Sequence, residues 1–259
     1  MTALVTSLGR SVLALGRELG GLILLGARLL HALVTWRRGA PDARELWSAL
    51  HRMGNRSVPI VLATALFAGG LMAIQAGTFV KKLGATGLAG WGAGYAVLRE
   101  IGPILIGLMF SGRVGANTTA ELATMTVTEQ LDGLRALAID PLRYLILPRV
   151  LAMTFMLVVL TVLGDLVALV GSSIVGYTVL GIEWSTMYFS FADNLAPADF
   201  LHGVTKSVAF GGAIALSSCH FGISVRGGAA GVGRAVNASV VSSAVAIVVL
   251  DFFLTYVTA

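Results

Sequence analysis

The chain has 259 residues, of which 56% are apolar and only 12% are charged, and its formal net charge is +5. Soluble domains carry about 25% charged residues, so this composition argues against a soluble globular domain and indicates a polytopic membrane protein. The alternative, a wholly buried soluble α/β core, fits the uncharged stretches poorly. In a membrane protein the excess of positive charge is read through loop topology rather than as a nucleic-acid footprint. The single cysteine, Cys219, cannot form an intrachain disulfide and lacks the companions of a metal site.

Residues 1–36 are apolar but carry three arginines, Arg10, Arg17 and Arg28. Their spacings of 7 and 11 are close to whole helical turns, so the three side chains share one face of a helix. Leucines cluster on the opposite face. This pattern predicts an amphipathic helix that lies in the membrane interface. The alternative is a first transmembrane helix, in which three arginines would be costly unless they snorkel or face a partner.

Five later segments are long and apolar enough to cross a bilayer, given a helical rise of about 1.5 Å per residue. We expect them at residues 58–80, 92–112, 148–180, 203–225 and 235–257. The predicted fold is therefore an all-α polytopic membrane protein, a single domain over residues 1–259, with an N-terminal interfacial amphipathic helix and five transmembrane helices.

A polar segment at residues 117–135 separates the second span from the third. Thr118-x-x-Glu121 and Thr126-x-x-Glu129 both fit a capping box, which predicts short separate helices here. Asp140-Pro141 fits an N-cap followed by proline at the first helical position, so it should start the helix of the third span. From spacing alone, the segment is either a docking element or a plain connector.

Positive charge is distributed unevenly between the two sides that five spans create. Three regions fall on one side: the N-terminal segment, the region 113–149 and the loop with Arg226 and Arg234. Together they hold fourteen of the eighteen lysines and arginines. The positive-inside rule places that side in the cytoplasm. The N-terminal side and the polar segment are then cytoplasmic, and the C-terminus is periplasmic.

The region from Leu98 to Ala152 resembles the signature of the MlaE (YrbE) family of ABC-transporter permeases, in LREIGPILIGLMFSGRVGANTTAELATMTVTEQLDGLRALAIDPLRYLILPRVLA. KSVAF and LDFFLT extend the resemblance into the later spans. The resemblance implies a homodimeric permease of the bacterial inner membrane that moves phospholipid or a related lipid between inner and outer membranes. It also implies cytoplasmic ABC ATPase subunits and a periplasmic MCE-domain lipid-binding protein as partners, and no nucleic acid.

The lysines agree with a division of labour between subunits. A P-loop needs glycine directly before lysine, so that backbone amides cradle phosphate while the ammonium reaches it. The lysines here, Lys81, Lys82 and Lys206, follow Val80, Lys81 and Thr205. The sequence therefore predicts a transport subunit that is not itself an enzyme and has no cofactor of its own; ATP and Mg would sit on the partner ATPase.

Within the polar segment, residues 121–134 resemble the family's coupling helix, which docks into a groove on the ATPase. The resemblance implies contacts from apolar, polar and acidic side chains, namely Glu121, Leu122, Met125, Thr128, Glu129, Leu131 and Asp132. The acids would face a complementary rim.

Arg99 and Glu100 stand in an apolar run, where unpaired charges are expensive. The family's matching LRE motif implies that they line a lipid-binding cavity between two copies, with Arg99 able to meet a phosphate. Gln75, Phe79 and Tyr95 would line the same cavity. The alternative is that the two charged residues form salt bridges to neighbouring helices and fix the packing.

Asp165 and Asp251 are lone carboxylates within predicted spans. They are compatible with proton coupling, although an interhelical hydrogen bond or a place near the outer interface is the favoured interpretation. A proton-driven secondary transporter is the main competing function, but no inverted repeat supports it. A membrane scaffold without transport is the third hypothesis.

Overall fold

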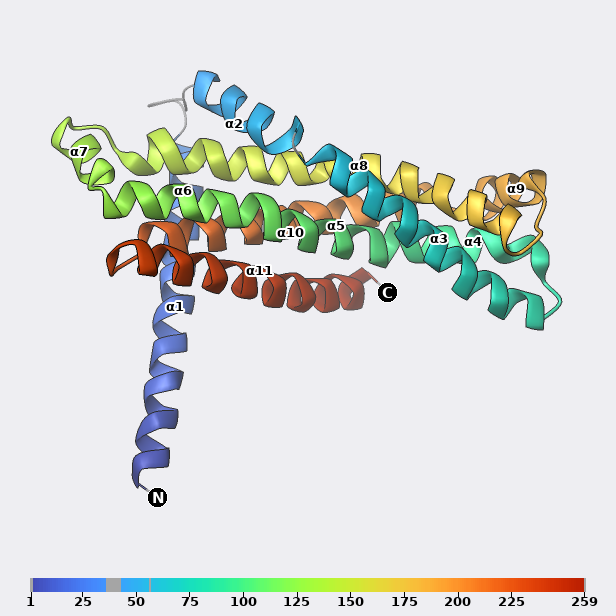
Figure 1. Cartoon of the computed structure of the whole chain (residues 1–259), viewed down its shortest axis with the longest axis horizontal. Helices are drawn as coiled ribbons and strands as arrows, with labels where there is room; N and C mark the ends of the chain where they lie inside the picture. The colour runs from blue at the N-terminus through green and yellow to red at the C-terminus, as the bar shows by residue number, and fades with distance from the viewer. Residues whose placement is uncertain (1, 36–42, 56, 259) are drawn as a thin grey trace.

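A computed structural model describes residues 2–35, 43–55 and 57–258, and the regular structure within these ranges is entirely helical. Most of the long helices run side by side in one elongated bundle, and α1 runs across one end of it (Figure 1). The helices are α1 (Thr2–Val34), α2 (Ala43–Asn55), α3 (Val58–Lys82), α4 (Ala89–Ala96), α5 (Gly102–Phe110), α6 (Ala116–Val127), α7 (Gln130–Ala136), α8 (Leu147–Thr178), α9 (Trp184–Asn194), α10 (Pro197–Ile223) and α11 (Gly228–Thr258).

The predicted second span does not end before the polar segment. π-helical turns at Val97–Ile101 and Ser111–Gly115 join α4, α5 and α6 into one continuous helix over Ala89–Val127. The prediction of capping boxes was therefore wrong. Thr118 and Thr126 both lie inside α6, where the Thr126 hydroxyl donates to the Leu122 carbonyl 2.8 Å away instead of capping a helix start. A short separate helix, α7, does follow, but Glu129 occupies its N-cap position and makes no side-chain cap.

The predicted start of the third span is confirmed. Helical structure begins at Pro141, and the Leu142 N–H donates to the Asp140 carboxylate over 3.0 Å. A π-helical turn at Leu142–Ile146 then leads into α8. Proline fits at this position because its missing N–H would have no partner in the first helical turn.

Four helices of the described chain are long and apolar enough to cross a membrane: Val58–Lys82, Ala89–Val127, Leu142–Thr178 and Gly228–Thr258. The expected span at 203–225 lies in α10 and is not among them. α10 carries Asp199, Lys206 and His220, and it packs against α8, α11 and α6, so its polar residues are buried in the bundle. The chain is thus an all-helical membrane protein, and the fifth crossing stays a prediction.

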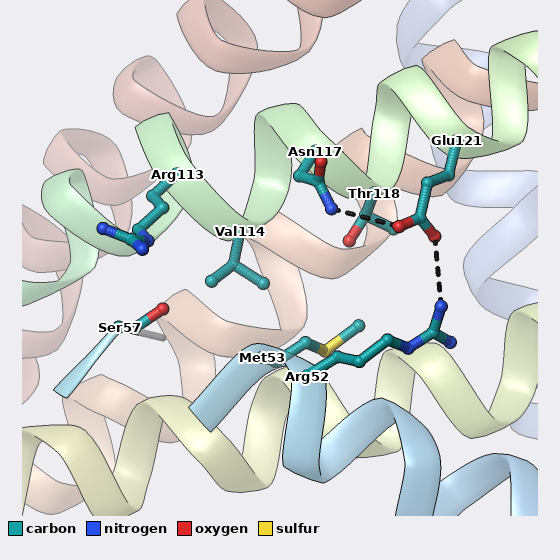
Figure 2. Close-up of a pocket in the computed structure, with 8 residues that line it drawn as sticks. All are labelled: Arg52, Met53, Ser57, Arg113, Val114, Asn117, Thr118 and Glu121. Carbon is teal, nitrogen blue, oxygen red and sulfur yellow. Dashed lines mark hydrogen bonds and ion pairs between the residues drawn. The ribbon is translucent and has the colours of Figure 1, made fainter. Parts of the chain in front are cut away.

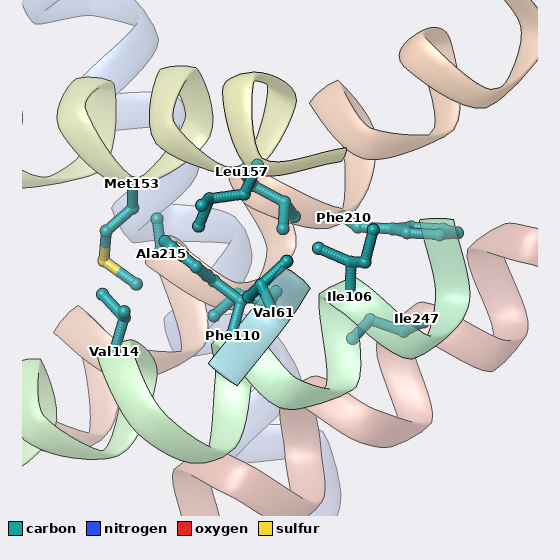
Figure 3. Packing of buried hydrophobic residues seen from close by; sticks show 11 residues of the cluster. Val61, Ile106, Phe110, Val114, Met153, Leu157, Phe210, Ala215 and Ile247 are labelled. Atoms are coloured by element: carbon teal, nitrogen blue, oxygen red, sulfur yellow. The ribbon is translucent and has the colours of Figure 1, made fainter. Parts of the chain in front are cut away.

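The main core lies where α3, α5, α8, α10 and α11 meet. Figure 3 shows side chains from these helices converging, among them Val61, Ile106, Phe110, Leu157 and Phe210, each at most 2% exposed. This apolar centre holds the elements together between two polar ends. α7 lies at one end of the bundle, and α4 and α9 lie at the other (Figure 1).

α1 is fastened to the α7 end of the bundle by one stripe of its surface. Leu25, Leu29 and Ala32 are buried against the cluster formed by residues such as Leu122 and Cys219. Two turns earlier, a carboxylate oxygen of Glu18 lies 2.9 Å from Nε2 of His220 on α10.

α1 runs crosswise to the bundle (Figure 1), as expected if α1 lies in the membrane plane while the bundle crosses the membrane. Arg17 and Arg28 are exposed, as the amphipathic pattern predicted, and the side chain of Arg10 lies outside the described residues. Leu29 faces the protein rather than lipid, because the bundle covers that stripe of α1.

Candidate functional site

The α6–α7 hairpin forms an exposed tip at one end of the bundle (Figure 1). Thr128, Glu129 and Asp132 are all exposed there. Glu129 connects the two helices in a left-handed conformation with φ of 59°, and Ala138 has φ of 58° just after α7. Left-handed backbone is uncommon for residues other than glycine, so the tip has a defined shape rather than that of a generic loop.

Two of the apolar residues predicted for partner contact point inward instead. Leu122 is fully buried and Leu131 is 5% exposed, and both pack in the cluster that fastens α1. Met125 is partly buried against the same cluster. These side chains therefore support the tip from within, while Thr128, Glu129 and Asp132 form its outer surface.

Three polar side chains of the same chain contact the Glu121 carboxylate. It lines a pocket of about 250 Å³ between the end of α2 and the start of α6 (Figure 2). Its carboxylate lies 3.0 Å from a guanidinium nitrogen of Arg149, in contact without hydrogen-bond alignment, and 3.9 Å from Arg52. It also accepts a hydrogen bond from Asn117 over 3.1 Å. Glu121 thus links α2, α6 and α8.

A second charged cluster is centred on Lys206, which is fully buried in the middle of the bundle. Its ammonium lies 2.6 Å from the Glu100 carboxylate and 2.8 Å from that of Asp251, and it donates to the Thr255 hydroxyl over 2.8 Å. Thr255 in turn donates to Glu100 over 3.1 Å. One lysine of α10 therefore holds two acids that come from different membrane-crossing helices.

Arg99 pairs with Asp199, another residue of α10. Its guanidinium lies 3.5 Å from the Asp199 carboxylate and 5.1 Å from the centre of the Tyr95 ring, within cation–π range. Asp199 also accepts from the Ala196 N–H over 3.0 Å, so it caps the start of α10. Both adjacent charges in the Val97–Ile101 π-helical turn are thus paired with α10, and π-helical turns are frequent at functional sites.

The remaining predicted cavity residues divide into two groups. Tyr95 joins Arg99 through the ring contact, and its ring centre lies 5.7 Å from that of Trp91 at a tilt of 40°. Gln75 and Phe79 lie on the exposed surface of α3, with Phe79 66% exposed. A single chain therefore brings Tyr95, Arg99 and Glu100 together but leaves Gln75 and Phe79 facing outward.

Asp165 is buried without a partner. Both carboxylate oxygens lack a hydrogen-bond partner among the described residues, and the residue is 1% exposed. The carboxylate packs on Gly102 of α5, where a side chain would collide with it. Asp251, in contrast, is held in an ion pair with Lys206, as the interhelical interpretation predicted.

Comparison with known proteins identifies the family. The family model described as Permease MlaE matches residues 46–257. The chain belongs to the MlaE permease family. A probable ABC transporter permease protein of Rickettsia felis is 37% identical over 203 residues, which is 78% of each chain. The intermembrane phospholipid transport system permease protein MlaE of Haemophilus influenzae is 31% identical over 261 residues, covering 97% of this chain and 95% of its own.

A plant protein is also similar to this MlaE-family permease. TRIGALACTOSYLDIACYLGLYCEROL 1 of Arabidopsis thaliana is 35% identical over 228 residues, which cover 88% of this chain and 63% of the plant protein. The family match begins at residue 46, so α1 lies outside it, whereas α3 to α11 and both charged clusters lie within it.

The sequence alone did not identify three residues that form ion pairs in this MlaE-family permease. They are Lys206, Asp199 and Arg149, to which the local sequence pattern assigns no partner. A usable signal did exist: Asp199 and Lys206 are seven residues apart, so they share a face of one helix. No cluster of three metal-ligating side chains occurs within the part of the chain that the structure describes.

Proposed function

We propose that the chain is the permease subunit of an ABC transporter that moves phospholipid or a related lipid between the inner and outer membranes. Membership of the MlaE permease family carries this proposal, and the name of the Haemophilus influenzae relative supplies the substrate class. The fold suits the task, because an all-helical bundle with several membrane-crossing helices can form a path for lipid.

ATP hydrolysis belongs to a separate subunit in this proposal, with ATP and Mg bound there and no cofactor in this chain. The α6–α7 tip is the proposed docking element, and its exposed Thr128, Glu129 and Asp132 would meet the ATPase. Glu121, Leu122, Met125 and Leu131 support the tip, because they contact this chain's own helices. The tip would be cytoplasmic, and the C-terminus periplasmic beside an MCE-domain partner.

The proposed lipid cavity lies between two copies of the chain. Arg99, Glu100 and Tyr95 would form its polar end, and the outward-facing Gln75 and Phe79 would be covered by the second copy or by lipid. A homodimer also accounts for the apolar surface of α3, where Phe67 and Leu71 are exposed as well. Arg99 is suited to a phosphate because guanidinium groups bind phosphate through two parallel hydrogen bonds.

Two of the three carboxylates that a proton-driven transporter would use are paired, and Asp165 is the one without an ion-pair or hydrogen-bond partner among the described residues. Glu100 and Asp251 share Lys206, so taking up a proton at either one would break an ion pair in the interior. A scaffold without transport is not favoured by the family match, whose model is described as a permease. Lipid transport accounts for both the charged interior and the exposed tip.

The docking role is tested by reversing the two exposed acids. Glu129→Lys with Asp132→Lys should abolish co-purification of the ATPase and lipid-stimulated ATP hydrolysis by the complex, because two charges at the interface change sign. The matched control is Glu183→Lys with Asp193→Lys, at exposed positions of the opposite end, which should leave both unchanged. Full ATPase association in the Glu129 and Asp132 variant would overturn the assignment of the tip.

A further inference from the structure

A groove of about 550 Å³ runs between α1 and the segment that joins α7 to α8. One wall comes from Leu24, Leu25 and Ala32 of α1, and the other includes Leu131 and Ile146. Leu25, Ala32, Leu131 and Ile146 are buried, while Leu24 is 61% exposed at the edge. The groove therefore offers an apolar floor that a hydrocarbon chain can cover.

The rim of this groove is basic on both sides. Arg28 and His31 line it from α1, and Arg135 and Arg143 line it from the opposite wall. Asp140 is the acidic residue among the described residues that line it. An occupant that is apolar in its body and negative at its head would match this distribution of charge.

The arginines of the rim differ in how far they are already paired. Arg143 lies 4.0 Å from the Asp140 carboxylate and donates to the Thr35 hydroxyl over 3.0 Å. Arg135 lies 2.6 Å from the Asp132 carboxylate. Arg28 is exposed and makes no ion pair or hydrogen bond with any residue that the structure describes. Its guanidinium is the uncompensated charge of the groove.

The position of α1 sets the depth of the groove in the membrane. α1 runs across the end of the bundle (Figure 1), and its side away from the bundle exposes Ile23 and Leu30. Such a helix lies at the boundary between headgroups and acyl chains. Arginines at this level are positioned to meet lipid phosphates.

We propose that the groove binds one anionic phospholipid of the surrounding leaflet, with its phosphate against Arg28 and Arg143 and an acyl chain over Leu25 and Ile146. The lipid would brace α1 against α7, because Leu131 of α7 belongs to the same floor. This is a structural lipid, distinct from the lipid proposed near Arg99. An acidic protein surface would match the rim but would leave the apolar floor uncovered.

The test measures headgroup preference in the full-length chain. The protein is reconstituted without ATPase in nanodiscs of equal phosphatidylglycerol and phosphatidylcholine, and the lipids that stay bound after extraction are counted by native mass spectrometry. Wild type should retain phosphatidylglycerol preferentially. Arg28→Ala should lower that preference about fivefold, the effect of one arginine at a membrane surface. Arg28→Lys should keep most of it, because the charge remains.

Arg17→Ala is the matched control, since Arg17 is exposed on the same helix but does not line the groove. An equal loss of preference in Arg17→Ala would overturn the proposal in favour of general surface charge. An unchanged preference in Arg28→Ala would also overturn it. That outcome would leave an acidic protein surface as the occupant that still matches the basic rim. The assay needs neither ATP nor transport, so its failure is distinct from failure of the proposed function.

Discussion

At the scale of single residues, the chain places a lysine where it cannot be solvated and surrounds it with acids. Lys206 donates hydrogen bonds to the Glu100 carboxylate and the Thr255 hydroxyl and lies 2.8 Å from the Asp251 carboxylate as an ion pair, so its charge is compensated inside the bundle. Such a cluster is stable only when it is complete. Removing one partner leaves the others as uncompensated charges in a low-dielectric interior.

Lys206→Ala should therefore destabilise the protein by about 3 kcal/mol, the lower end of the cost of breaking a buried ion pair, because Glu100 and Asp251 keep partial exposure. Unfolding in mixed micelles of increasing SDS content measures this change. The triple variant Lys206→Met, Glu100→Gln and Asp251→Asn should recover most of the loss, since it removes all three charges. A triple variant as unstable as Lys206→Ala would show that packing, rather than charge, dominates.

The residues that needed partners could be predicted from the sequence, but the partners could not. Arg99 and Glu100 stand in an apolar run, and that alone indicates that each must be compensated. Asp199 and Lys206 lie about a hundred residues later, and only the packing of α10 against the Val97–Ile101 turn brings them within reach. The burial of Leu122 depends in the same way on α1, whose docking position the local pattern does not specify.

At the scale of elements, α3 and α8 pack against each other extensively, and glycine permits their approach. A side chain at Gly69 would collide with the Ala168 carbonyl, and one at Gly171 with the Leu66 carbonyl. Because the obstacles are backbone atoms, rotamer changes cannot relieve the overlap. Small residues at helix interfaces are typical of membrane proteins. The many glycines in the sequence indicate close packing, but they do not specify which helices meet.

Gly69→Ala or Gly171→Ala should each cost about 1–3 kcal/mol of stability, the usual range for overpacking, despite the higher helix propensity of alanine. SDS-dependent unfolding of the purified variants measures the change. Gly233→Ala in α11 is the matched control, because open space surrounds its Cβ position; it should be neutral or gain up to about 1 kcal/mol from propensity. Stability equal to wild type in both interface variants would contradict the close α3–α8 contact.

At the scale of the whole molecule, the two ends of the bundle carry different elements, and the membrane topology decides which end faces the cytoplasm. The α7 tip and the start of α11 lie at one end, and α9 lies at the other (Figure 1). The uneven charge of the loops allowed this separation to be predicted. The crossing of α10 could not be settled in the same way, because its buried Lys206, Asp199 and His220 lower its hydropathy while the bundle shields them.

Single cysteines at three exposed positions should resolve this topology. With five crossings, Asp193→Cys and Thr258→Cys react with a membrane-impermeant maleimide in intact spheroplasts, whereas Asp132→Cys reacts only after the membrane is opened. Wild type gives the background, since Cys219 is fully buried. If α10 does not cross, Thr258→Cys becomes protected together with Asp132→Cys. Labelling of Asp132→Cys in intact spheroplasts would invert the orientation and remove the tip from the side where an ATPase can hydrolyse ATP.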